Sequence, residues 1–339
     1  MKALKRLKNF AGKKQKKESR KASIVISATL ILHAQLCFPL VTKAQTSPIA
    51  PTTESIPASE HGSPLPPPQA PGASNVLTPE ITSLLVPSAN QTQTIFDVGN
   101  TQGVLHFTDL INTDSLHIVS TNAQYSTATI FASGNIINAG TITTLIPTGF
   151  TGAISNLNLV LNAGGSIFNS GTISSAGSLN LTAGNVIVNV VTPQLPQSIP
   201  VMQAQTDLVM QATSIINQGT INSAIGNVNL CSATSNLAIN NIAGTISAPN
   251  GFINVFTADM LHSATLDILG GDFVSRALKL KSGLVSVDVN SISGPVNLTA
   301  VEAALVAHTG TLEFGTANVS GDRQQEQSGS HFDLIALLL

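Results

Sequence analysis

One short motif that recurs along the chain limits the fold more than any other feature. It reads Asn135-Ile-Ile-Asn-Ala-Gly-Thr-Ile142 and recurs as Ser166-Ile-Phe-Asn-Ser-Gly-Thr-Ile173 and Ser214-Ile-Ile-Asn-Gln-Gly-Thr-Ile221, while a fourth copy, Ala238-Ile-Asn-Asn-Ile-Ala-Gly-Thr-Ile246, has one inserted residue. Each copy alternates apolar and polar residues, which is typical of a short strand with one buried face. The recurrence indicates a chain of stacked, similar units.

A second motif follows the glycine of the first by six or seven residues. Its copies are Gly177-Ser-Leu-Asn-Leu181, Gly226-Asn-Val-Asn-Leu230 and Gly251-Phe-Ile-Asn-Val255, with Gly294-Pro-Val-Asn-Leu298 standing alone later. It also alternates, and glycine lies where a turn is needed between the two strands. The two motifs together therefore predict two short strands joined by a turn in each repeat.

The spacing of the motif glycines sets the size of the repeat. Gly140, Gly171, Gly219 and Gly244 are separated by 31, 48 and 25 residues. The shortest gap fits one coil, and the 31-residue gap fits a coil with a modest loop. The longest gap contains the turn-rich insertion 191–200 and room for a second coil. This pattern predicts an all-β parallel β-helix, or β-solenoid, whose coils stack about 4.8 Å apart.

A β-sandwich is the competing all-β fold, because short alternating strands with frequent turns also build it. The repeats favour the solenoid, since stacked coils place like residues on like, and inward asparagines can form hydrogen-bonded ladders. The residues to which the repeats give a structural role are Asn138, Gly140, Ile142, Asn169, Gly171, Ile173, Asn217, Gly219, Ile221, Gly244 and Ile246.

Strand alternation fixes the register that we expect, because a slip of one residue would expose every isoleucine. The isoleucines should point into the solenoid and stack on one another, while the threonines before them should point out. The inward residues are Ile173, Ile221 and Ile246, and the outward ones are Thr172, Thr220 and Thr245.

The N-terminus predicts export. Ten of the fifteen Lys and Arg residues lie within residues 1–21, and the apolar run 22–41 follows them. A basic region, an apolar region and a small residue describe a signal peptide over residues 1–44, cut between Ala44 and Gln45 by the general secretion machinery. The run is also long enough for an uncleaved anchor in the inner membrane, which is the alternative.

Composition divides the rest of the chain. Residues 45–90 carry ten of the seventeen prolines and are predicted to be a disordered, extended linker. Residues 91–322 are the predicted β-helix, and the tail 323–339 lacks the repeat pattern. After Lys43 there are four basic and sixteen acidic residues, giving 4 − 16 = −12. A domain with this net negative charge repels nucleic acid, so we expect no nucleic-acid partner.

The combination Ile-x-Asn-x-Gly-Thr-Ile followed by Gly-x-Leu-Asn-Leu resembles the haemagglutinin-type repeats of filamentous haemagglutinins and related large exoproteins, over roughly residues 130 to 300. The resemblance implies a right-handed β-helix and a bacterial adhesin that is secreted or held at the cell surface. It also implies an outer-membrane partner transporter that reads Asn-Pro-Asn motifs. The nearest match, Ala248-Pro-Asn-Gly-Phe252, lacks the first Asn and aligns with the other copies as a repeat turn.

A β-helical polysaccharide lyase or glycoside hydrolase is the rival reading, and it would need clustered carboxylates or a cationic base. Asn112-Thr113-Asp114 matches one element of a polygalacturonase signature, but the others are missing, and Asp272 is isolated. Lys279 and Lys281 alternate on one strand face, which solvent exposure explains. The histidines His106, His117, His262 and His308 have no metal-ligand spacing.

We therefore expect an exported adhesin-like β-helix that binds or presents at the cell surface, with a glycan or a host or matrix molecule as ligand. No catalytic residue, cofactor or metal site is predicted. A purely structural extracellular spacer is the third alternative, and its mark would be a featureless surface.

Overall fold

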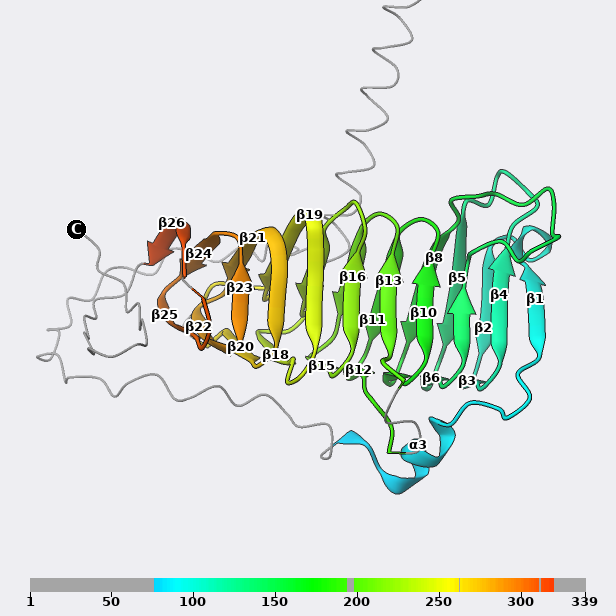
Figure 1. Cartoon of the computed structure of the whole chain (residues 1–339), viewed down its shortest axis with the longest axis horizontal. Helices are drawn as coiled ribbons and strands as arrows, with labels where there is room; N and C mark the ends of the chain where they lie inside the picture. The colour runs from blue at the N-terminus through cyan, green and yellow to red at the C-terminus, as the bar shows by residue number, and fades with distance from the viewer. Residues whose placement is uncertain (1–75, 194–197, 262, 311, 320–339) are drawn as a thin grey trace, which may run out of the picture. The chain divides into compact units, whose positions relative to one another are not determined.

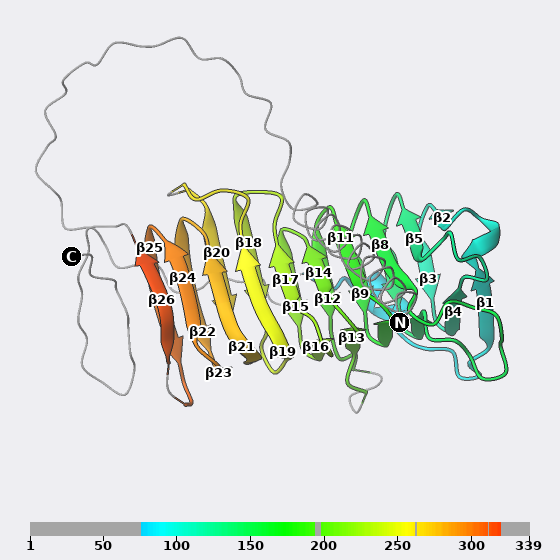
Figure 2. The same ribbon diagram turned by 90° about the horizontal axis from the view of Figure 1, so that it is seen from above.

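The computed structural model describes residues 76–193, 198–261, 263–310 and 312–319, and they form a right-handed parallel β-helix. Figure 1 shows the coils side by side, from β1 in cyan to β26 in red. Figure 2, turned by 90°, shows the same succession from above. The predicted fold class is confirmed. Residues 1–75, which include the expected signal peptide and most of the expected linker, lie outside the described residues.

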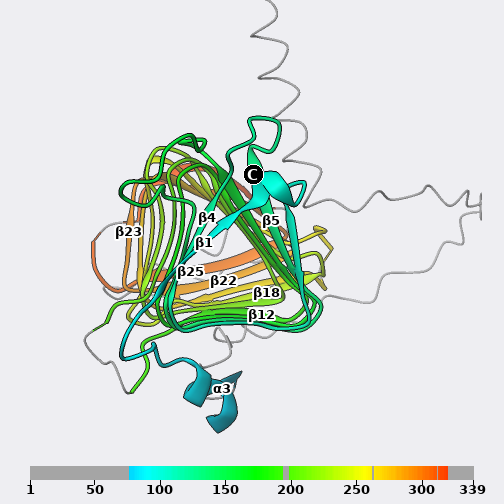
Figure 3. The same cartoon turned by 90° about the vertical axis from the view of Figure 1, so that its right-hand side faces the viewer.

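Each coil crosses three faces in turn, and Figure 3 shows the resulting triangular outline. A 17-stranded sheet forms the first two faces and a nine-stranded sheet forms the third. The first face contains β1 (Gln93–Asp97), β4 (Ser115–Val119), β7 (Thr141–Thr143), β10 (Thr172–Ser175), β13 (Val201–Ala204), β16 (Thr220–Ser223), the beginnings of β19 (Thr245–Phe256) and β21 (Asp272–Lys281), and β23 (Ser291–Ser293).

The second face contains β2 (Val104–Phe107), β5 (Thr127–Ala132), β8 (Asn158–Ala163), β11 (Leu179–Ala183), β14 (Leu208–Gln211), β17 (Val228–Cys231), the ends of β19 and β21, β24 (Val296–Ala300) and β26 (Phe314–Val319). The third face contains β3 (Leu110–Asn112), β6 (Ile136–Asn138), β9 (Ile167–Asn169), β12 (Val186–Asn189), β15 (Ser214–Asn217), β18 (Asn236–Asn240), β20 (Thr265–Leu269), β22 (Leu284–Val289) and β25 (Glu302–Ala307). The nine strands on this face define nine complete coils among the described residues, counted from β1, and β26 begins a tenth.

The hydrophobic core is a set of inward rows that run along the solenoid. Ile173, Ile221 and Ile246 are fully buried, as the alternation predicted, and the threonines that precede them are partly exposed. Ile221 pairs directly with Ile246. Ile173 does not touch Ile221, because Met202 of β13 lies between them. The expected direct stacking of all three isoleucines is therefore wrong at this step, and the 48-residue gap does hold a second coil.

The motif glycines are required by close backbone approach between coils. A Cβ built on Gly171 would lie 2.0 Å from the carbonyl oxygen of Gly140 in the coil before it. Atoms cannot approach so closely without a backbone shift, so any side chain would push the two coils apart. The same crowding occurs at Gly219, where the Cβ would lie 2.1 Å from the oxygen of Pro200. Coil packing, in addition to the turn, explains these glycines.

Residues 76–90 correct the expected linker boundary. They contain the helix α3 (Pro79–Leu84) and pack on the outside of the third face, as Figure 3 shows for α3. Leu85 is fully buried against outward apolar side chains of β6, β9, β12 and β15, and Ser170 Oγ donates to its carbonyl oxygen across 2.9 Å. The outward residues that it covers are Ile137, Phe168, Val188 and Ile216. Burial of this apolar row stabilises an ordered conformation of the segment, although its proline-rich composition predicted disorder.

Candidate binding surface

Six asparagines at the corner between the third and first faces form one hydrogen-bonded ladder. In each step the Nδ2 of one asparagine donates to the Oδ1 of the asparagine in the next coil, across 2.7 to 2.8 Å. The members are Asn112, Asn138, Asn169, Asn189, Asn217 and Asn241. The ladder predicted for Asn138, Asn169 and Asn217 is confirmed, although Asn189 lies between the last two. All six are buried, so they hold the coils together and leave ligand contact to outward side chains.

The carboxylates considered for catalysis lie far apart. Asp114 precedes β4 in the second coil, and its Oδ1 accepts from the Thr92 amide across 3.1 Å. Asp272 begins β21 in the eighth coil, where its Oδ1 accepts from Asn290 Nδ2 and Ser291 Oγ, each at 2.6 Å. Six coils separate them by roughly 30 Å. A glycosidase pair is about 5 to 10 Å apart, so these two cannot act on one bond.

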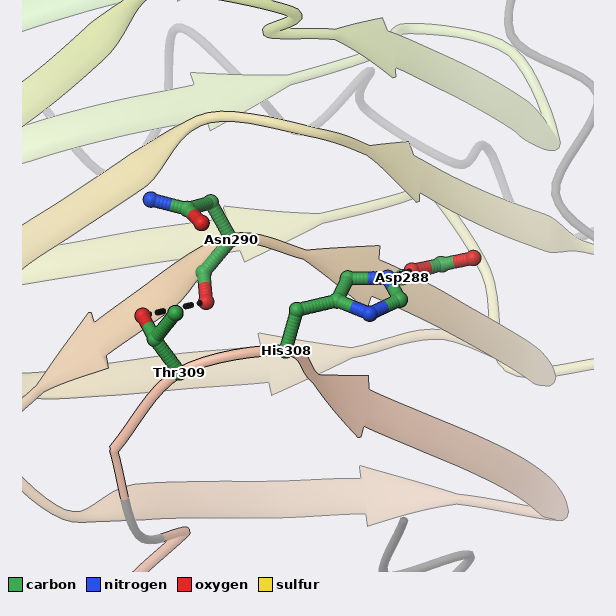
Figure 4. Close-up of polar contacts among 4 residues, drawn as sticks. All are labelled: Asp288, Asn290, His308 and Thr309. Atoms are coloured by element: carbon green, nitrogen blue, oxygen red, sulfur yellow. Dashed lines mark hydrogen bonds and ion pairs between the residues drawn. The ribbon is translucent and has the colours of Figure 1, made fainter. Parts of the chain in front are cut away.

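The histidines are placed singly. His308 Nε2 lies 2.5 Å from Asp288 Oδ1 on the outside of the third face, and the neighbouring Thr309 Oγ1 donates to the carbonyl oxygen of Asn290 (Figure 4). His117 Nδ1 contacts the carbonyl oxygen of Leu145 across 3.0 Å. Within the described ranges, no group of three or more His, Cys, Asp or Glu side chains could hold a metal ion. His262 lies outside the described residues.

His106 of β2 rests beside an aromatic side chain from the next coil. The rings of His106 and Phe131 are tilted by 59°, with their centroids 5.7 Å apart. Such a contact packs two outward side chains together on the second face. His106 is exposed and makes no ion pair with a described acidic residue, so we treat it as a surface histidine.

The cationic side chains of the described region gather on one strand. Arg276, Lys279 and Lys281 of β21 are all exposed, and Leu278 and Leu280 between them are buried. The prediction that Lys279 and Lys281 share one strand face is confirmed. These three are the only Lys or Arg residues in the described ranges.

An aromatic ring from the preceding coil completes this surface. The Nζ of Lys279 lies 3.8 Å from the centroid of the Phe252 ring, and the Cζ of Arg276 lies 5.8 Å from it. We call Phe252, Arg276, Lys279 and Lys281 the β21 patch. Cations over a ring face are attracted by its quadrupole, by about 0.5 to 1 kcal/mol at exposed sites. Phe252 therefore holds two of the cations close together at the corner between the first and second faces.

The cations of the patch have no acidic partner among the described residues. The ion pair found there is His308–Asp288, and none involves Arg276, Lys279 or Lys281. Segment 248–252, which matched a secretion motif weakly, lies at the register shift inside β19, where the strand passes from the first face to the second. The sequence did not indicate that Phe252 joins the lysines, because that depends on the register between β19 and β21.

The fold and this surface define the chain as a parallel β-helix repeat protein that presents a compact cationic patch. In comparisons with protein-family models, curated proteins and solved structures, none matches the chain. No helix within the described ranges has the length and hydrophobicity needed to span a membrane.

Proposed function

We propose that the chain is an exported, adhesin-type β-helix that binds an anionic ligand through the β21 patch and carries out no catalysis. The observation that supports this most is the grouping of three exposed cations on one strand, with no acidic partner among the described residues. The rest of the region is acidic, so a local positive field is confined to this place. Such a field attracts acidic groups and orients them.

The chemistry of the patch favours an acidic glycan or an acidic segment of a host or matrix molecule. Arg276 offers a planar fork that suits a carboxylate or sulfate, and the two lysines add mobile point charges. Phe252 is only partly buried, so its ring offers apolar contact to a sugar. The wide separation of Asp114 and Asp272 supports binding over hydrolysis.

Export is part of the proposal and rests on residues 1–44. The general secretion machinery would carry the chain across the inner membrane, and an outer-membrane partner transporter is a further candidate. Mass spectrometry of protein recovered outside the cytoplasm should find a chain that begins near Gln45. An intact N-terminus on membrane-held protein would indicate an anchor instead.

The binding proposal is tested by removing the charges of the patch. The full chain is applied to immobilised sulfated and carboxylated polysaccharides, with neutral dextran as reference, over a range of salt concentrations. We expect binding that weakens with salt and falls at least tenfold in Lys279→Gln/Lys281→Gln, because counterion release is lost.

The matched control is Thr182→Glu/Gln211→Glu. Both residues point outward from the second face in the row that contains Lys281, and both are partly exposed. This variant changes the net charge by the same amount, −2, at positions three and four coils away from Lys281. It should lose much less affinity than the lysine variant. An equal loss of affinity in both variants would contradict the proposal that the β21 patch binds the ligand. If the unaltered chain bound none of the polymers, the protein would more plainly fit a structural spacer.

A further inference from the structure

Exposed apolar side chains concentrate in the first coil. Ile95, Phe96, Val104 and Ile111 are four of the ten large hydrophobic residues that are exposed in the described structure. They come from β1, β2 and β3, so all three faces contribute. A soluble domain rarely leaves several such side chains together at one end without a partner.

Phe96 is an inward side chain of the first coil that remains exposed, whereas Leu105 and Leu110 of the same coil are buried. It pairs with Ile118 of the second coil and belongs to the inward row of the first face. Ile118 is fully buried, but Phe96 is 39% exposed, because no coil of the described residues lies beyond it. One of the inward side chains in the first layer of the core is therefore in contact with solvent.

The backbone at the same end is also unpaired. Within the described residues, β1, β2 and β3 pair on one side only, with β4, β5 and β6. Their sequences, QTIFD, VLHF and LIN, contain no lysine, arginine or proline, and no register shift interrupts their pairing. Lysine, proline and bulges are common protections of natural edge strands, and these three strands lack them. Asp97 is their only Asp, Glu, Lys or Arg residue, and its carboxylate accepts hydrogen bonds from Gly99 and Thr121.

The chain that precedes β1 approaches from the side. Leu85 packs on the third face, and Ser88 N donates to the carbonyl oxygen of Thr113 across 2.9 Å. Residues 76–92 therefore run along the outside of the third face toward the first coil, as Figure 1 shows. Their path leaves the unpaired edges of β1, β2 and β3 uncovered.

The opposite end of the solenoid has a different character. No large hydrophobic residue after Leu261 is strongly exposed in the described ranges. The pairing of β24 with β26 is interrupted by a register shift at Val296, which distorts the last strand. The two ends are therefore poorly matched to each other, whereas the first coil is apolar and can match a second copy of itself.

We propose that two copies of this chain associate through their first coils, related by a two-fold axis. Strand β1 of one copy would pair antiparallel with β1 of its partner, and Phe96 would be buried between the two cores. This contact is isologous and closes at a dimer, which avoids filament growth. It would also place the two β21 patches on the order of 70 Å apart, from the coil spacing of about 4.8 Å.

The dimer does not depend on the ligand of the β21 patch, so the two proposals can fail separately. The test measures the mass of the full chain by sedimentation and by light scattering after gel filtration. We expect twice the chain mass for the unaltered protein and the monomer mass for Ile95→Lys/Val104→Lys/Ile111→Lys, because charges at an edge prevent pairing.

The control variant is Leu145→Lys/Ile225→Lys/Ile242→Lys. It adds the same three charges at exposed apolar positions along the sides of the solenoid, with exposures of 51%, 58% and 50%. It should remain a dimer. Dissociation of both variants would overturn the proposal, as would a monomeric unaltered chain at about 100 μM. Circular dichroism melts confirm that each variant is folded.

The chain has two cysteines, Cys37 and the fully buried Cys231. Orientation is tested with a bismaleimide crosslinker in a Cys37→Ser background. Ile95→Cys alone should give a covalent dimer, while Thr316→Cys, which is exposed on β26, should give none alone. Crosslinking that requires a mixture of the two variants would mean head-to-tail association and would overturn the two-fold arrangement.

Discussion

The Nδ2 of Asn138 donates to the Oδ1 of Asn169 across 2.7 Å, and Asn169 donates in the same way to Asn189. Each Nδ2 also reaches backbone carbonyls. That of Asn169 lies 3.0 Å from the Gly171 oxygen and 3.2 Å from the Val201 oxygen. The corner of the coil thus turns sharply without leaving its carbonyl groups unpaired. An apolar residue could not satisfy these groups, which explains asparagine at a fully buried position.

We expect Asn169→Ala to destabilise the protein by about 2 to 4 kcal/mol, because it leaves the buried Asn189 Oδ1 and backbone carbonyls without donors. Asn162→Ala is the control. Asn162 lies in β8 of the same coil, points outward and makes no described hydrogen bond. It should change the free energy of unfolding by less than about 0.5 kcal/mol. Urea unfolding measures both variants, and similar losses would show that the ladder contributes no special stability.

A second prediction concerns the acidity of Asp267 in β20. Burial on the outside of the third face raises the pKa of this carboxyl above its usual value. Its neighbours in register are Ala238 and Ser286, which offer no positive charge. A folded-state pKa above the unfolded value means that stability is lost as pH rises from about 3.8 through the folded pKa. Asp267→Asn should therefore raise the melting temperature at pH 7 and have little effect at pH 3.

The pKa of Asp97 is shifted in the opposite direction to that of Asp267. Burial alone would raise its pKa, but hydrogen bonds from Thr121 Oγ1, the Thr121 amide and the Gly99 amide together lower it below the usual value. Its ionised form therefore stabilises the fold above the unfolded pKa, and this stability is lost as pH falls through the folded pKa. Asp97→Asn should lower the melting temperature at pH 7. Matching pH profiles for the Asp97 and Asp267 variants would contradict both assignments.

Much of the fold could be predicted because the determinants are local. Alternation of apolar and polar residues decides which side chains enter the core, and it placed Ile173, Ile221 and Ile246 correctly. The sequence left room for the coil with Met202 but could not place its residues, because insertion 191–200 separates Asn189 from its first-face strand and removes the usual Gly-Thr-Ile motif. The sequence Val186-Ile-Val-Asn189 was the remaining signal for that ladder position.

Features that depend on contacts between distant residues could not be predicted. Asn112 was read as part of a weak enzyme signature, but it begins the described ladder because the third face places it beside Asn138. Leu85 lies in a proline-rich segment, and its burial depends on an apolar row assembled from four different coils. The contact of Lys279 with Phe252 likewise depends on the register between β19 and β21, in which Phe252 pairs with Ala277.

The sharpest prediction compares two adjacent residues of β16. Ile221 is fully buried between Met202 and Ile246, and Thr220 is partly exposed in the outward row between Val201 and Thr245. Ile221→Asp would place an unpaired charge between two coils and should cost several kcal/mol. Thr220→Asp should cost no more than about 0.5 kcal/mol, as for an ordinary surface change. Thermal melts of the two variants measure the contrast. If both substitutions were tolerated equally, the strand register and the stacking of coils that it defines would be wrong.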